Sequence, residues 1–262
     1  KKSVKLNPWK YLKVAAVIFP FIIAAVLFLF FRETPNKNRI AEQLLIEKSS
    51  PRGEKRTVFL SDGSKVKLNA ESKISYLKRF NENERIVQLD GEAFFEVTPD
   101  KSRPFIVKSG NIETKVLGTS FNIKAYPDER KIMIAVKTGL VSVENKNQKL
   151  TNKQNKSIVL SPMEMATYYD ETNQTTVSDY DPLKVLAWKD GMLYFVNATM
   201  EEFITKVERW YGVDIIVERT EPIAKGITGI FKDQSLEEIL MGTKDASEFE
   251  YKFLSNGKVL IK

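Results

Sequence analysis

One stretch of the sequence carries residues whose types and order suit a covalent reaction, Leu117-Gly-Thr-Ser-Phe121. The hydroxyl of Thr119 directly follows Gly118, which is the arrangement for an N-to-O acyl shift. In that reaction Oγ1 attacks the Gly118 carbonyl through a five-membered ring, and water then hydrolyses the ester. The absent glycine side chain removes steric hindrance, and local backbone strain favours the step. The structural alternative places Gly118 at a bulge or tight bend and makes Thr119 an ordinary strand residue.

Two missing residue types limit every other kind of chemistry. The 262-residue chain contains neither cysteine nor histidine. Disulfides, thiolate zinc sites, Ser-His-Asp and Cys-His triads and histidine-ligated metals are therefore excluded. The net charge of +7 comes largely from five lysines before position 14, so no basic stripe for nucleic acid remains. The sequence predicts no cofactor, no metal site, no nucleic-acid partner and no enzyme beyond the possible self-cleavage.

Gly118 and Thr119 lie in a region with the hydrophobic period of β-strands. From about residue 40 to residue 170, apolar residues alternate with polar ones in short runs such as Val66/Leu68. Turn signals such as Asp62-Gly-Ser64 separate these runs. Many short strands with this spacing predict an all-β domain, placed at 32–170. It is either a sandwich or a short solenoid, and the lack of a fixed repeat argues against the solenoid.

The last part of the chain, 188–262, predicts a small α/β domain with duplicated βαβ units. It follows an acidic, aperiodic linker at 171–187. Segments 194–204 and 230–240 resemble each other, and each passes from a short strand into a helical capping box. In such a box the hydroxyl and the glutamate satisfy two backbone N–H groups reciprocally. The two boxes are Thr199 with Glu202 and Ser235 with Glu238.

Both helices of the predicted α/β domain have expected ends. The first ends at Gly212 and the second at Gly242, because glycine commonly follows a helix. Strands are expected to follow at 213–217 and 249–254, and a hairpin turn leads into a last strand at 259–261. The glutamate pairs at the two helix starts are interpreted as capping and dipole-compensating residues rather than as acid/base catalysts.

An uninterrupted apolar stretch at 14–31, VAAVIFPFIIAAVLFLFF, precedes the β region. As a helix it is ~27 Å long, which is enough to cross the hydrocarbon layer of a membrane. A buried core helix would show a polar face, and a signal peptide would be followed by small residues, so neither alternative fits. The sequence thus predicts a transmembrane helix at 14–31. Five lysines lie within 1–13, so the positive-inside rule predicts that this short stub is cytoplasmic and that the remainder of the chain is periplasmic.

Several motifs, in a fixed order, resemble the FecR-type transmembrane sensors. In the β region they are Thr57–Ala70, Leu89–Val97, Arg103–Val107, Val116–Ile123 and Leu160–Ala166. Segments 188–195 and 209–213 resemble the C-terminal domain of the Bacteroidetes branch, which is similar to the short secretin/TonB N-terminal domain. The resemblance covers nearly everything after the apolar stretch.

The resemblance implies a location, a function and a set of partners. Its members are anti-sigma factors anchored in the inner membrane of Gram-negative bacteria. The periplasmic part senses the signalling domain of a TonB-dependent outer-membrane receptor, and the cytoplasmic part holds or activates an extracytoplasmic-function sigma factor until regulated proteolysis releases it. An intramembrane protease and the lipid bilayer are thus further partners, and Pro20 is a candidate for local helix opening. Some members cut themselves at a Gly-Thr bond, and Gly118-Thr119 stands at the matching place.

One departure from the family concerns the sigma factor. The cytoplasmic anti-sigma helices are missing, because only 1–13 precede the apolar stretch. We expect either a truncated sequence or a copy that does not bind a sigma factor.

Two function hypotheses from different classes follow. The first is a signal transducer that docks its partner by strand addition at a free sheet edge. Its candidate partner-binding residues are Val213, Ile215, Val217, Val259 and Ile261. The second is a membrane-tethered periplasmic scaffold or binding module without a sigma partner. A carboxylate-based periplasmic hydrolase is a third alternative.

Overall fold

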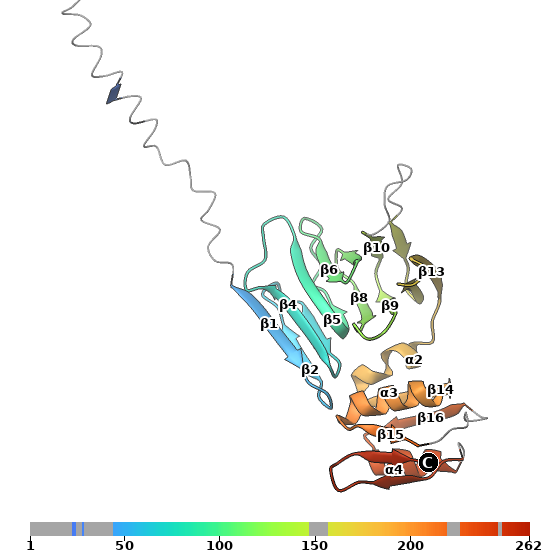
Figure 1. Ribbon diagram of the computed structural model, residues 1–262. Coiled ribbons are helices and arrows are strands. Elements are labelled where there is room, and N and C mark those ends of the chain that lie inside the picture. The colour runs from blue at the N-terminus through green and yellow to red at the C-terminus, as the bar shows by residue number, and fades with distance from the viewer. Residues whose placement is uncertain (1–22, 25–27, 29–43, 147–156, 219–225, 246–247) are drawn as a thin grey trace, which may run out of the picture. The chain divides into compact units, whose positions relative to one another are not determined.

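The structure is a computed structural model that describes residues 23–24, 28, 44–146, 157–218, 226–245 and 248–262 (Figure 1). The chain divides into two units, 1–43 and 44–262, and the fold described below is that of the second. The predicted membrane span, 14–31, lies almost entirely outside the described residues. No helix within the described part of the chain is long and apolar enough to cross a membrane.

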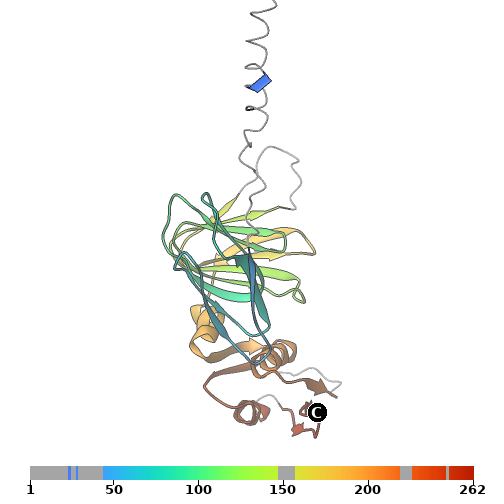
Figure 2. The same cartoon turned by 90° about the vertical axis from the view of Figure 1, so that its left-hand side faces the viewer.

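Thirteen strands of the second unit form one curled sheet (Figures 1 and 2). They are β1 (Leu45–Ser50), β2 (Arg56–Phe59), β3 (Lys65–Leu68), β4 (Ser72–Leu77), β5 (Arg85–Glu96), β6 (Phe105–Ser109), β7 (Ile112–Val116), β8 (Ser120–Ala125), β9 (Lys131–Thr138), β10 (Val141–Asn145), β11 (Ile158–Leu160), β12 (Glu164–Tyr169) and β13 (Gln174–Asp179). The period-two pattern therefore predicted the class of this region correctly.

Strand β5 organises the sheet, because it pairs with four other strands. Its first half pairs with β4 and β6, and its second half pairs with β3 and β8. Gly91 lies where the partners change; its φ is +104°, and a Cβ there would lie 2.7 Å from the Cα of Ser72. Only glycine therefore fits at this crossing. The curl packs residues of both halves, such as Val87 and Phe95, into one buried core.

The strand pairing decides between the two predicted architectures. Every described pair in this sheet is antiparallel except β5 with β6. A solenoid stacks parallel strands from successive repeats, so the solenoid alternative is wrong and the curled sheet is closer to a sandwich.

The prediction that 171–187 is an aperiodic linker is also wrong, because most of this segment forms regular secondary structure. Its first part forms β13, which pairs antiparallel with β12 over six residues, Gln174–Asp179. Its second part forms helix α2 (Pro182–Leu186), whose N-cap Asp181 accepts a hydrogen bond from the backbone N–H of Leu183. The polar composition reflects exposure of an edge strand rather than lack of structure.

The C-terminal domain contains the elements that the duplicated pattern predicts. After the 3₁₀ turn η1 (Ala187–Asp190) come β14 (Met192–Ala198), α3 (Met200–Tyr211), β15 (Ile215–Val217), β16 (Ile227–Lys232), α4 (Leu236–Lys244), β17 (Tyr251–Phe253) and β18 (Val259–Ile261). Both capping boxes form as predicted. Helix α3 ends at Gly212 in the left-handed conformation, whereas α4 continues past Gly242 to Lys244. Strand β14 pairs with β16, and β15, β18 and β17 form a second small sheet.

Candidate functional site at the domain junction

Arg209 of α3 joins the C-terminal domain to the β domain. The residue is only 7% exposed, and its guanidinium lies 3.5 Å above the ring of Tyr126. It donates hydrogen bonds to three carboxylates: Nε to Glu71 at 3.0 Å, Nη1 to Glu129 at 3.1 Å and Nη2 to Asp128 at 3.1 Å. A planar guanidinium has the fork geometry that such multiple contacts need. One side chain thus connects the helix to two separate loops of the β domain.

Two glycines let the backbones of the domains touch. The N–H of Gly53 donates to the carbonyl of Arg209 at 2.9 Å. A Cβ on Gly212 would lie 3.2 Å from the carbonyl oxygen of Arg52. The Arg52 side chain in turn pairs with Asp214 at 2.9 Å. The glycine that ends α3 therefore also forms part of the interdomain contact.

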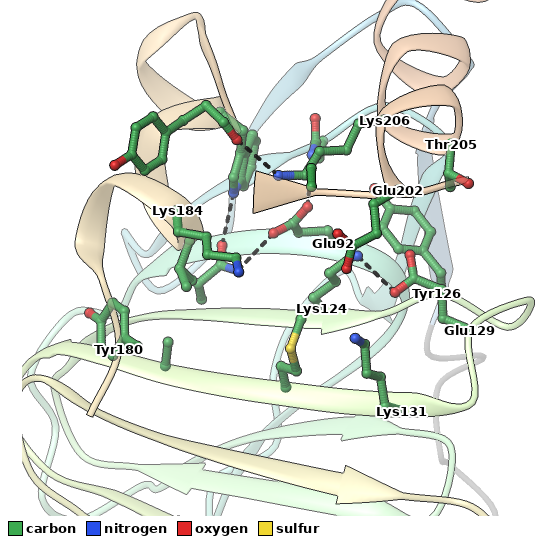
Figure 3. A pocket seen from close by; sticks show the side chains of 18 of the residues that line it. Glu92, Lys124, Tyr126, Glu129, Lys131, Tyr180, Lys184, Glu202, Thr205 and Lys206 are labelled. Atoms are coloured by element: carbon green, nitrogen blue, oxygen red, sulfur yellow. Dashed lines mark hydrogen bonds and ion pairs between the residues drawn. The ribbon is translucent and has the colours of Figure 1, made fainter. Parts of the chain in front are cut away.

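A cavity of about 970 Å³ lies beside this contact and is lined by both domains (Figure 3). Glu92 of β5 lines it, although the residue is only 7% exposed. Its Oε2 accepts from the amide of Asn69 at 2.8 Å, and its Oε1 accepts from the amide of Asn122 at 2.9 Å. The indole N–H of Trp188 donates to the Asn122 carbonyl oxygen at 3.2 Å, which fixes the orientation of that amide. The carboxylate is therefore held rigidly.

Lysines from the C-terminal domain and the β domain line the same cavity. Lys206 of α3 donates to the backbone oxygen of Tyr194 at 3.3 Å, and burial, together with the charge of Lys124, lowers its pKa. Lys124 pairs with Glu129 at 2.7 Å. Figure 3 shows Lys206 and Glu92 on facing elements of the cavity. A buried carboxylate and a largely desolvated ammonium thus line the same cavity.

The structure places Gly118 and Thr119 between β7 and β8, outside the residues that line the cavity. A Cβ on Gly118 would lie 2.7 Å from the Cα of Pro99, so a side chain is excluded there. Thr119 is 4% exposed, and its Oγ1 donates to the carbonyl of Leu140 at 3.0 Å. The pairing of β8 with β9 shifts register between Ser120 and Phe121, so the predicted irregularity occurs beside this bond.

Only part of the predicted docking edge is a free edge. Strand β18 pairs with β15 on one side and with β17 on the other, and Val259 and Ile261 are fully buried. Their assignment to a free edge is therefore wrong. Strand β15 pairs only with β18 among the described residues, and its Val217 is 41% exposed. Val213 precedes β15, and its carbonyl accepts from Arg52.

Sequence reasoning missed Arg209 and Glu92 as site residues. Arg209 lies beside Trp210, and no local pattern there indicates a contact with another domain. For Glu92 a signal existed: Ala93, Phe94 and Phe95 follow it without alternation, which is typical of a strand covered on both faces. The described residues contain no group of Asp and Glu side chains arranged to hold a metal ion.

Two family models match separate parts of the chain. The family described as FecR protein matches residues 47–142, and the one described as FecR, C-terminal matches residues 192–261. Two crystal structures of a candidate anti-sigma factor from Parabacteroides distasonis ATCC 8503 are similar to this chain, at 31% and 30% identity. In both cases the match covers 83% of this chain and 98% of the other, with a TM-score of 0.72. No curated protein matches the chain. The chain belongs to the FecR family.

Proposed function

We propose that this protein is an anti-sigma factor of the inner membrane that relays a periplasmic signal to an extracytoplasmic-function sigma factor. The observation that carries the proposal is the 31% identity, over 98% of its length, to a candidate anti-sigma factor. The signal comes from a TonB-dependent outer-membrane receptor, whose signalling domain the C-terminal domain recognises.

Gene deletion tests the output of this pathway. Deleting the gene is expected to change transcription of one sigma regulon, and the restored gene is expected to reverse that change. A transcriptome that does not differ between the deletion strain and its parent contradicts the anti-sigma function and favours the scaffold alternative.

The free edge of β15 supports docking by strand addition. The carbonyl of Asp214 accepts from Val259, and the N–H of Glu218 donates to Ile261. In a parallel ladder the backbone groups of alternate residues face opposite sides, so those of Ile215 and Val217 face away from β18. The N–H of Ile215 is already bonded to the side chain of Glu208 at 2.6 Å. The N–H of Val217 is therefore the donor that an added strand would use.

Replacing Val217 by proline is expected to abolish receptor binding, because it removes the outward donor without breaking a bond to β18. The matched control is Val217→Thr, which keeps the N–H and the β-branched shape. Affinity of the purified full chain for the receptor's signalling domain, measured by calorimetry, should fall at least about tenfold for proline alone, as expected for lost strand hydrogen bonds. Equal affinity for both variants would exclude the free edge of β15 as the docking site for the receptor's signalling domain.

Self-cleavage at Gly118-Thr119 is a second proposal. Two observations support it: there is no room for a side chain at Gly118, and a hydrogen bond to the Leu140 carbonyl holds the Thr119 hydroxyl in place. Oγ1 of Thr119 attacks the Gly118 carbonyl, the amide nitrogen leaves as a free amine, and water hydrolyses the ester. The products are a Gly118 carboxylate and an N-terminal Thr119 with its hydroxyl restored.

Intact-mass measurement under denaturing conditions tests the cleavage. The wild type should give two fragments whose masses fit a break after Gly118, and Thr119→Ala should give one uncut chain. Thr138→Ala is the matched control, because Thr138 also bonds within this turn region, through its Oγ1 to the N–H of Ser120 at 3.2 Å. A single uncut mass for the wild type refutes the proposal.

A further inference from the structure

The cavity between the domains has the size of a small-molecule site. Its volume of about 970 Å³ lies at the upper end of the range for ligand pockets, roughly 300–1,000 Å³. Apolar side chains, among them Met133, Met165 and Leu193, line part of it. Neither the docking edge nor the Gly118-Thr119 bond uses this space, so it is a separate feature of the molecule.

Glu92 gives the cavity a built acceptor. Each carboxylate oxygen takes one amide N–H, from Asn69 or Asn122, and an ionised carboxylate accepts about four hydrogen bonds. None of the described lysines or arginines forms an ion pair with it, although it is 7% exposed. Removing a carboxylate from water without a cation is costly. The two amides thus hold an acceptor with unused capacity for a positively charged donor.

Lysines supply the complementary group. Among the described residues, Lys206 makes one hydrogen bond, to the backbone carbonyl of Tyr194 at 3.3 Å. Lys131 and Lys184, which also line the cavity, form no ion pair within the described ranges. Burial lowers the pKa of Lys206, while the charge of Glu92 acts in the opposite direction. Glu92 and Lys206 therefore interact across the cavity without direct contact. A molecule placed between them satisfies both if it has a cationic donor at one end and an anionic acceptor at the other.

We propose that this cavity binds a small zwitterion of the amino-acid or short-peptide class. Its ammonium group pairs with Glu92 between the two amides, and its carboxylate pairs with Lys206. Apolar side chains of the ligand contact the methionines and leucine of the lining. Because the lining comes from both domains, an occupied cavity also strengthens their contact. This inference does not depend on the proposed function.

Calorimetry with one probe and its two blocked forms tests the proposal. The probe is the dipeptide leucyl-leucine, and the full chain is purified in mild detergent because of its apolar stretch. Leucyl-leucine is expected to bind with a dissociation constant of about 1 mM or below, and the N-acetyl and C-terminal amide forms at least about tenfold more weakly. No binding of leucyl-leucine, or equal binding of all three compounds, overturns the proposal.

Two variants assign the ends of the ligand. Glu92→Gln should weaken leucyl-leucine about tenfold and leave the N-acetyl form unaffected, because that form lacks the ammonium. Lys206→Met should weaken leucyl-leucine and leave the amide form unaffected, which keeps the test valid if Glu92→Gln does not fold. Lys115→Met, an exposed lysine of β7, is the control and should bind like the wild type. Undiminished dipeptide binding by Lys206→Met, or by a folded Glu92→Gln, refutes the assignment.

Discussion

Replacing Asp62 with alanine is expected to destabilise the β domain by about 3–5 kcal/mol, the usual cost of leaving a buried charge unpaired. Its carboxylate lies 2.7 Å from Nη1 of Arg85, and the two side chains are 4% and 0% exposed. Arg85 also donates to the carbonyls of Arg103 and Thr98, at 2.9 and 2.8 Å, and these bonds keep its guanidinium inside the domain. Arg85 therefore cannot move into water when its partner is removed.

The urea midpoint of unfolding measures this loss. Asp90→Ala is the matched control, because Asp90 also precedes a glycine, here within β5, but its ion pair with Lys73 is long, 3.7 Å, and exposed. That pair should contribute about 0–1 kcal/mol. Asp62→Asn keeps the shape and removes the charge, so an intermediate effect is expected. Equal midpoints for Asp62→Ala and Asp90→Ala would show that the Arg85 charge is compensated without Asp62.

Replacing Arg209 with methionine is expected to separate the two domains while leaving each of them folded. The change leaves Glu71, Asp128 and Glu129 facing one another without their shared cation. Because Glu71 and Asp128 are 48% and 66% exposed, solvent screens part of the effect, and we expect a loss of about 2–3 kcal/mol. The measurement is limited proteolysis, with faster cleavage expected around η1 in the variant.

Two further variants separate the role of Arg209 from a general charge effect. Arg209→Lys keeps the charge but not the fork geometry, so it should restore little of the contact. Arg103→Met removes an arginine that pairs with Asp100 at 2.8 Å inside one domain, and its proteolysis pattern should match the wild type. Unchanged cleavage around η1 in Arg209→Met would mean that the backbone contact at Gly53 and Gly212 is sufficient to hold the two domains together without Arg209.

Much of the fold could be predicted because its signals are local. The period-two pattern of the β region, the two capping boxes and Gly212 each depend on residues that are close in the sequence. The predictions failed where distant partners decide. Strand β13 is polar because it is an edge strand. Segment 259–261 is the central strand of its sheet because β15 pairs with one side of it and β17 with the other.

The candidate site was harder to predict for the same reason. Arg209 looks like a solvated helix residue, and its three acidic partners lie more than seventy positions earlier in the chain. Asp62 was assigned to a turn, which is correct, but its pairing with Arg85 depends on how β5 crosses the sheet. Such residues become recognisable only when the topology has brought the strands together.

The four-fold pairing of β5 has a consequence for how the chain folds. Strands β3 and β4 precede β5, but β6 and β8 follow it, so β5 keeps an open edge until Ala125 is available. Until then the edge exposes Phe94 and Phe95 next to unpaired backbone, which favours association with other chains. Pairing over such sequence distances is slow. When the chain becomes available from its N-terminus onward, as during synthesis, the risk of aggregation is therefore greatest before β8 is available to pair with β5.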